Sequence, residues 1–252
     1  MLIYFIVDNK VWLAKGLVEV QTVMVAFDSL REKMVACQLQ PEAVTHTALL
    51  HAFATVPRED FVPDHLKAFA YLDKDLLLTC ANGERKRYLL RPASLAKLLQ
   101  LARIQRGDSV LIVGAGCGYS AALVSQLAQH VVALEEDEAL LGKARALFTD
   151  VFENIVLEKG KLSQGYVAKA PYDVIVVEGR AEQLPSSLYA QLNEGGRLVG
   201  VVGLGDSSRA MCYTKKGEEI AALEAFDLSA PLLPSFVEKS ACVFFVNIVN
   251  FS

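Results

Sequence analysis

Cysteine and histidine are scarce in this chain of 252 residues, and neither forms a cluster. No two cysteines have the CxxC spacing of a zinc or redox motif, and no histidine has a second ligand at metal-binding spacing. An odd number of scattered cysteines argues against a disulfide framework and favours reduced thiols in a cytoplasmic protein. We therefore expect no metal site. The cysteines are Cys37, Cys80, Cys117, Cys212 and Cys242, and the histidines are His46, His51, His65 and His130.

Long apolar runs and basic blocks are also missing. The apolar start is interrupted from Asp8 onward, short of the ~20 residues that a membrane-spanning helix needs. It lacks the charged start and cleavage site of a signal peptide, so we interpret residues 1–24 as an N-terminal appendage. The net charge is −4 and no run of five basic residues occurs, whereas nucleic-acid binding is driven by phosphate neutralisation. We expect neither a membrane nor a nucleic acid as partner.

What the chain does contain is hydrophobic residues, 53% of the total, arranged in alternating helical and extended patterns. From Pro92 onward, helical apolar spacing alternates with short continuous apolar runs, which is typical of a parallel sheet covered on both faces. We expect a doubly wound, mostly parallel α/β sheet over residues 92–252, with a helical and irregular cap over residues 25–91. The expected strands are 110–113, 131–134, 155–158, 174–177, 197–202, 210–214 and 242–249, and expected helices include 119–129, 138–148 and 187–192.

The stretch VLIVGAGCGYSAA, residues 110–122, places a glycine turn directly after the first of these strands. Gly114, Gly116 and Gly118 alternate, and a helical pattern follows at once. The dinucleotide fingerprint GxGxxG needs a glycine where this chain has Tyr119, and the phosphate-loop motif GxxxxGK[ST] is absent. The turn lies at the carboxyl ends of the strands, where such sheets bind ligands. It therefore favours a ligand without a pyrophosphate.

The next strand supplies the second half of the signal, because VVALEED ends with Glu135 and two further acids. An acidic side chain at this position can accept hydrogen bonds from the hydroxyls of a ribose. Glycines beside an amino-acid portion and Glu135 on the ribose together predict S-adenosylmethionine. The alternative is that the glycines only form a tight turn. We interpret Glu136 and Asp137 as a solvated helix start that Asp137 caps, and Cys117 as a small filler.

Several segments, in order along the chain, resemble protein-L-isoaspartate O-methyltransferases, a family of S-adenosylmethionine-dependent, Rossmann-like methyltransferases. The glycine turn alone is shared by many methyltransferases, whereas the segments together are far more specific. The resemblance covers roughly residues 27–205. The segments are VPREDFVP (56–63), AYLD (70–73), VLIVGAGCGYSAA (110–122), APYDVIVVEG (170–179) and QLNEGGRLVGVVG (191–203).

The resemblance implies a protein-repair reaction. A methyl group passes from S-adenosylmethionine to the α-carboxylate of L-isoaspartyl residues in damaged polypeptides. It also implies that the glycine turn, the acid after the next strand and the glycine after the third strand bind the cofactor. In this chain those residues are Gly114, Ala115, Gly116, Gly118, Tyr119, Glu135 and Gly160.

Two positions depart from the family pattern. In the segment RYLLRP, alignment on Pro92 puts Leu90 where the family carries an active-site serine, and Tyr88 where a threonine is usual. Lys161 replaces an acid that approaches the adenine in the family. The candidate residues on the acceptor side are therefore Tyr88, Leu90, Arg91 and Pro92. If only a hydroxyl is missing, Leu90→Ser is expected to raise isoaspartyl turnover.

Methylation of a carboxylate needs no general base, because a carboxyl group with a pKa of about 4 is already ionised at neutral pH. The protein has to hold acceptor and donor in line about 3 Å apart and to exclude water. Two alternatives to isoaspartyl repair remain. One is a methyltransferase with a different acceptor. The other is a cofactor-binding protein with weakened catalysis that uses Leu90 and the apolar tail as an interaction surface.

Other charged residues near the expected site allow two interpretations each. Glu178 and Arg180, after the fourth strand, either line the pocket or pair with each other. A group of basic residues before Pro92 either attracts an anionic acceptor or forms a solvated loop. These basic residues are Arg85, Lys86, Arg87 and Arg91.

Overall fold

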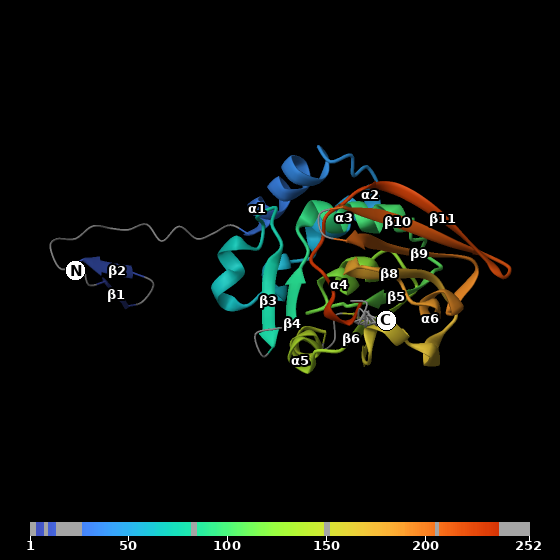
Figure 1. Ribbon diagram of the computed structural model, residues 1–252. Coiled ribbons are helices and arrows are strands. Elements are labelled where there is room, and N and C mark those ends of the chain that lie inside the picture. Colours follow the sequence, from blue (N-terminus) through green and yellow to red (C-terminus); the bar gives the residue numbers. More distant parts are fainter. Residues whose placement is uncertain are drawn as a thin grey trace, which may run out of the picture.

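The computed structural model describes residues 4–7, 10–13, 27–81, 85–148, 152–204 and 207–236. Its central feature is a seven-stranded sheet with the strand order β11-β10-β9-β8-β5-β6-β7 (Figure 1). The strands of this sheet are β5 (Ser109–Val113), β6 (His130–Glu135), β7 (Ile155–Lys159), β8 (Tyr172–Ala181), β9 (Leu192–Leu204), β10 (Ser207–Lys216) and β11 (Glu219–Asp227).

The pairing of the strands confirms the expected doubly wound, mostly parallel α/β sheet. Strands β7, β6, β5, β8 and β9 pair in parallel, while β10 pairs antiparallel with both β9 and β11. The sequence pattern does not predict β11. Seven of its nine residues are exposed, so β11 lacks the buried apolar face that makes a strand recognisable.

The helices between the strands lie close to where the apolar spacing predicts them. Proline at the first position of α3 has no backbone N–H to lose there. Helix α4 ends at Ser125, before the predicted end at residue 129. These helices are α3 (Pro92–Ala102), α4 (Tyr119–Ser125), α5 (Glu138–Leu147) and α6 (Ser186–Ala190), with short 3₁₀ turns at Leu162–Gln164, Val167–Lys169 and Pro234–Phe236.

The segment before α3 is helical at first, as expected of the cap, and then differs from the expected irregular structure. β3 and β4 form an antiparallel hairpin there. Leu76 pairs with Leu89 at its open end. The elements of this segment are α1 (Phe27–Met34), a π-helical turn (Val35–Leu39), α2 (Thr47–Thr55), 3₁₀ turns at Arg58–Phe61 and Asp64–Phe69, β3 (Leu76–Ala81) and β4 (Arg85–Leu89).

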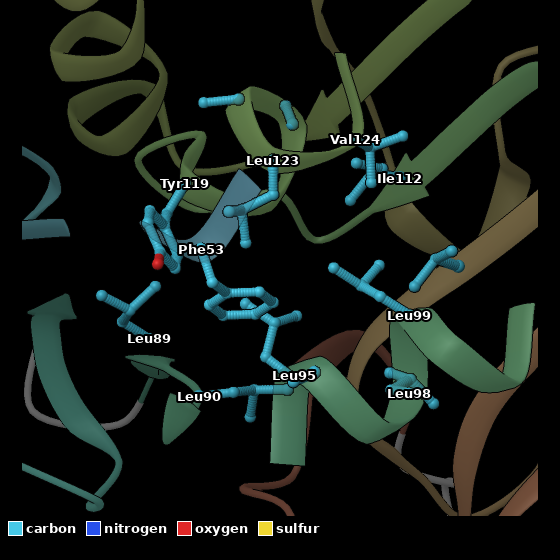
Figure 2. Packing of buried hydrophobic residues seen from close by; sticks show 14 of the residues in the cluster. Phe53, Leu89, Leu90, Leu95, Leu98, Leu99, Ile112, Tyr119, Leu123 and Val124 are labelled. Atoms are coloured by element: carbon cyan, nitrogen blue, oxygen red, sulfur yellow. The ribbon is translucent and has the colours of Figure 1, made fainter. Parts of the chain in front are cut away.

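Alternate side chains of β5 enter two different hydrophobic clusters, one on each face of the sheet. Val110 and Ile112 belong to the first cluster, and Leu111 and Val113 to the second; none of them is exposed. This explains why the strand is a continuous apolar run. The first cluster also contains residues of α2, α3, α4 and the hairpin (Figure 2). The segment before α3 and the sheet therefore share one core.

Two further expectations concern the ends of the chain. β1 (Tyr4–Val7) and β2 (Lys10–Leu13) form a two-stranded antiparallel sheet within the expected appendage. The strand expected at residues 242–249 lies outside the described residues. Among the residues that the structure describes, no helix combines the length and apolar character needed to cross a membrane.

Candidate cofactor site

The glycine turn after β5 adopts a backbone that side chains rarely tolerate. Gly114, Gly116 and Gly118 have φ angles of +86°, +58° and +92°, all in the left-handed region that favours glycine. A Cβ at Gly118 would also lie 2.6 Å from the ring of Phe148. The turn therefore requires glycine at these positions, and it leads directly into α4 at Tyr119.

Glu135, the last residue of β6, lies next to this turn, as the sequence predicts. Its side chain is fully buried. One carboxylate oxygen accepts a hydrogen bond from the backbone N–H of Gly116 at 2.7 Å. The other accepts from the N–H groups of Glu136 and Asp137 at 2.9 and 3.0 Å. The carboxylate thus joins the glycine turn to the start of α5, where Asp137 is the helix cap as predicted.

The remaining predicted cofactor residues lie around Glu135 and Gly116. The N–H groups of Gly114 and Ala115 both donate to the carbonyl of Leu134 on β6. Gly160 follows β7, and its N–H donates to the carbonyl of Glu135 at 3.2 Å. The carboxyl ends of β5, β6 and β7 are therefore held together, and the structure groups these predicted residues at one edge of the sheet.

Tyr119 packs into the core rather than standing over the turn. Its ring is fully buried against Phe53, whose ring centroid is 6.1 Å away (Figure 2). The ring centroid of Phe61 is 5.4 Å away. The guanidinium of Arg58 lies 4.9 Å from the Tyr119 ring centroid. Burial raises the pKa of Tyr119 to about 12. Tyr119 therefore contributes packing, and its hydroxyl stays protonated at neutral pH.

Two side chains of the protein itself fill the space at the glycine turn. Arg87 of β4 forms a bidentate ion pair with Glu135, with Nη1–Oε1 and Nη2–Oε2 distances of 2.5 and 2.9 Å. Arg87 Nη2 also donates to the carbonyl of Gly114 at 3.1 Å. Leu233, beyond β11, is buried, and its side chain lies close to Gly114 and Gly179. Arg87 and Leu233 therefore occupy the place beside Gly114 and Glu135 where the sequence predicts the cofactor.

Glu178 lies near the carboxyl end of β8 and is also buried. The hydroxyl of Ser120 on α4 donates to its carboxylate. Burial raises the pKa of Glu178 to about 7, against the lowering effect of Ser120, Arg87 and Arg58. Arg180 instead donates to the carbonyl of Gly203 at 2.9 Å. The suggested pairing of Glu178 with Arg180 is therefore wrong.

The acceptor-side candidates have different surroundings. Leu90 is only 1% exposed and lies in the core with Phe53 and Leu95 (Figure 2). Its carbonyl accepts a hydrogen bond from Arg58 Nη2 at 2.6 Å. The interpretation of Leu90 as part of an interaction surface is therefore wrong, because its side chain does not reach the surface. Tyr88 is partly buried in β4, where it pairs with Leu77.

Arg91 and Pro92 form the start of α3. Pro92 is the first residue of the helix and is buried. Arg91 Nε donates to the hydroxyl of Ser94 at 2.7 Å, and Nη1 lies 3.5 Å from Asp73. Asp73 also accepts from the N–H of Ala93 at 3.3 Å. These contacts fix the end of the hairpin against the helix, and they give Arg91 a structural role.

Of the basic residues before Pro92, the three whose side chains the structure describes do not converge on one anion site. Lys86 is exposed, Arg87 is buried on Glu135, and Arg91 contacts Asp73. Lys161, which stands at the family's acidic position, is exposed. Within the described ranges, no group of three or more metal-ligating side chains could hold a metal ion. Cys117 behaves as the expected filler, because burial raises the pKa of its thiol to about 11.

Comparison with known proteins identifies a family that matches most of this chain. A sequence model of the protein-L-isoaspartate(D-aspartate) O-methyltransferase family matches residues 30–227. The protein-L-isoaspartate O-methyltransferase 1 of Rhodopseudomonas palustris (strain HaA2) is 36% identical over 187 residues, which are 74% of this chain and 74% of that protein. The chain belongs to the protein-L-isoaspartate O-methyltransferase family. This confirms the resemblance, and with it the assignment to the S-adenosylmethionine-dependent methyltransferases.

Solved structures show the same fold. A protein-L-isoaspartate O-methyltransferase superposes with a TM-score of 0.68 at 26% identity, over 80% of this chain and 65% of that one, so this chain spans slightly less than two thirds of it. A Plasmodium falciparum protein described as a beta-aspartate methyltransferase, in complex with S-adenosyl-L-homocysteine, gives a TM-score of 0.64 at 18% identity, over 83% of this chain and 98% of that one. At that identity the second likeness shows the fold alone.

Within this protein-L-isoaspartate O-methyltransferase family member, sequence analysis missed the partner of Glu135. The run of basic residues groups Arg87 with its neighbours, whereas strand alternation sets it apart. Residues two apart in a strand share one face, so Arg87 faces the same side as buried Leu89, whereas Lys86 is exposed. An arginine on the buried face of a strand needs hydrogen-bond acceptors, and a carboxylate is the one that also balances its charge. The pattern predicts such a partner but cannot name Glu135, which lies 48 residues away.

Proposed function

We propose that this protein is an S-adenosylmethionine-dependent carboxyl methyltransferase that acts on L-isoaspartyl residues of damaged polypeptides in the cytoplasm. Family membership supports the proposal. The observation that carries it is the buried carboxylate of Glu135, which hydrogen-bonds the N–H of Gly116 in the left-handed glycine turn. An acid beside such a turn is the arrangement that binds the ribose of an adenosine ligand.

The proposal assigns cofactor binding to three places in the chain. Glu135 would hold the ribose hydroxyls, and Gly114 and Gly116 would let the backbone approach the amino-acid portion. Gly160 would border the adenine side. When bound, S-adenosylmethionine supplies an electrophilic methyl group on a sulfonium. The neighbouring buried residues would exclude water from this edge of the sheet.

The protein's contribution to the transfer is positioning. The α-carboxylate of an isoaspartyl residue is ionised at neutral pH, so no side chain needs to remove a proton. Orientation of two reactants can contribute up to about 7–11 kcal/mol in favourable cases. Leu90 contributes no hydroxyl to this positioning, because its side chain is buried in the core.

The proposal is tested by methyl transfer to an isoaspartyl peptide and to its aspartyl twin, with S-adenosylmethionine as donor. We expect methyl ester formation on the isoaspartyl peptide alone. Glu135→Ala is expected to remove cofactor binding and activity together, while Glu136→Ala, one residue further, serves as the matched control. Equal background signal on both peptides would contradict isoaspartyl repair.

A different acceptor is the second candidate function, and one observation favours it. Leu90 stands where the family carries its serine, and its side chain packs in the core. The acceptor side therefore differs from the family, while the glycine turn and Glu135 keep the family pattern. Binding of S-adenosyl-L-homocysteine without methylation of the isoaspartyl peptide would support this second function.

A further inference from the structure

The carboxylate of Glu135 has no free acceptor site. Its Oε1 accepts from Arg87 Nη1 and from the N–H groups of Glu136 and Asp137. Its Oε2 accepts from Arg87 Nη2 and the N–H of Gly116. A carboxylate offers about four lone-pair sites, and these donors already use them. A ribose diol would bring further donors to the same two oxygens, so at least one present donor has to leave.

Only one of these donors can leave without unfolding the local backbone. The N–H groups of Gly116, Glu136 and Asp137 belong to the glycine turn and to the start of α5, which β5 and β6 hold in place. Arg87 instead reaches the site from β4, and β4 pairs with β3 in a separate two-stranded sheet. A rotation of the Arg87 side chain would remove one donor from each carboxylate oxygen at once.

Leu233 lies at the same glycine turn as Arg87, although it follows β11 in the sequence whereas Arg87 precedes α3. A Cβ at Gly114 would lie 3.2 Å from Arg87 Nη2 and 3.4 Å from Leu233 Cδ2, so both side chains reach this glycine. A Cβ at Gly179 would lie 2.6 Å from Leu233 Cγ. The segment that carries Leu233 is tied to β8 by backbone hydrogen bonds between Arg180 and both Pro231 and Leu233. The chain therefore fills its own site from two sides.

We propose that Arg87 is an internal competitor of the cofactor: its guanidinium and the ribose hydroxyls occupy Glu135 alternately. This inference rests on the function proposed for the site, and it adds that the site is closed by its own hairpin. The apparent dissociation constant of the cofactor is the intrinsic value divided by the fraction of molecules in which Arg87 has left. A buried, bidentate pair keeps this fraction small, because the departure of Arg87 removes the charged partner of a buried carboxylate.

The first experiment is calorimetric titration of the full chain with S-adenosyl-L-homocysteine. Arg87→Gln removes the charge and the bidentate geometry, and it should tighten binding roughly tenfold or more. Arg87→Lys keeps a point charge without the fork, so it should give a smaller gain. Lys86→Ala is the matched control. It removes a positive charge from the neighbouring, exposed position of β4 and should leave the affinity unchanged.

The measured affinities distinguish a failure of the competition from a failure of the proposed function. Wild type that binds S-adenosyl-L-homocysteine as tightly as Arg87→Gln, or more tightly, would overturn the competition and leave the proposed function intact. No binding by any folded variant, with folding checked by circular dichroism, would overturn the proposed function and the competition together. Tighter binding by both Arg87→Gln and Lys86→Ala would point to a general charge effect and would also overturn the specific role of Arg87.

A second experiment uses the wild-type chain, in case the Arg87 variants fail to fold. Phenylglyoxal modifies accessible arginines, and mass spectrometry locates the modified residue. Without ligand, Arg87 should be protected, because its side chain is 5% exposed and paired, whereas Arg91, with a side chain 38% exposed, should react. Saturating S-adenosyl-L-homocysteine should raise the labelling of Arg87 relative to Arg91. Unchanged or lower labelling of Arg87 would overturn the competition.

Discussion

Leu90 is a core residue, and this changes what a serine at its position would do. From sequence alone, Leu90→Ser is expected to restore a positioning hydroxyl. The structure instead places the side chain in the cluster that contains Phe53 and Leu95 (Figure 2). A serine there would leave a cavity and bury a hydroxyl, both of which are costly. A substitution at position 90 is therefore expected to change the stability of the protein rather than the binding of the acceptor.

We predict that Leu90→Ser lowers the free energy of unfolding by about 3–5 kcal/mol, the sum of a lost buried side chain and a buried hydroxyl. Isoaspartyl turnover should not rise. Urea denaturation and the peptide methylation assay measure the two effects. Leu90→Met, which nearly conserves volume, is the control and should cost less than about 1.5 kcal/mol. Higher turnover at unchanged stability would show that residue 90 faces the acceptor after all.

Glu178 makes a second prediction, which concerns pH. Its pKa is raised by burial to about 7, above the ordinary value of 4.5. The buried acid favours the protonated form, so its stabilising contribution is full below about pH 4.5 and is lost as pH rises to about 7. Relative to Glu178→Gln, the wild type should therefore lose up to about 3 kcal/mol over this range.

Urea denaturation of wild type and Glu178→Gln at several pH values tests this. The difference in unfolding free energy between the two proteins isolates Glu178, because all other titrating groups are shared. Glutamine keeps an acceptor for Ser120, whose hydroxyl donates to the carboxylate in the wild type. A difference that stays constant between pH 4.5 and 7 would contradict the raised pKa.

The strand–turn–helix unit around Gly118 shows what a local motif can predict. The three glycines, the acid at the end of β6 and the cap of α5 all lie where the sequence puts them. Each depends on residues close together in the chain and on the rule that carboxyl ends of parallel strands meet at one edge. Such features are set by backbone geometry and strand order, and both can be read from spacing.

Gly118→Ala should be strongly destabilising. Its φ of +92° is unfavourable for alanine, and the new Cβ would lie 2.6 Å from the Phe148 ring. We expect a loss of about 2–4 kcal/mol from backbone strain and overpacking together. Gly142→Ala, in the middle of α5 with nothing within 4 Å of the new Cβ, should instead gain about 0.5–1 kcal/mol. Thermal melts of both variants check the opposite signs.

The β3–β4 hairpin shows where sequence analysis fails at the scale of elements. Only part of each strand carries an apolar signal, and the pairing depends on contacts that local spacing does not reveal. The arginine on its buried face finds its carboxylate 48 residues later in the chain. The sequence pattern also does not predict β11, because most of its residues are exposed and leave no alternating apolar signal. The spacing of apolar residues therefore does not predict two kinds of feature. One is the long-range partner of a polar side chain, and the other is a strand that faces solvent.

At the scale of the whole molecule, the antiparallel strands return the chain to its own site. After β8, the strands β9, β10 and β11 extend the sheet away from β5. The segment after β11 then comes back along β8, where Arg180 N–H donates to Pro231 and Leu233 N–H donates to Arg180. Ser235 also donates to Glu136 at the start of α5. Residues far apart in sequence therefore close the edge that carries Glu135.

Leu233→Ala should have two opposite effects because of this return. It removes a buried side chain, so unfolding without ligand should become about 2–4 kcal/mol easier. It also clears space above Gly114 and Gly179, which Leu233 contacts, so S-adenosyl-L-homocysteine should raise the melting temperature more than in wild type.

When Leu233→Ala is combined with Arg87→Gln, the gain in ligand affinity should differ from the sum of the single gains, because both side chains meet at Gly114 and contacting residues are coupled. Strictly additive gains in a calorimetric double-mutant cycle would show that the hairpin and the returning segment act on the site independently.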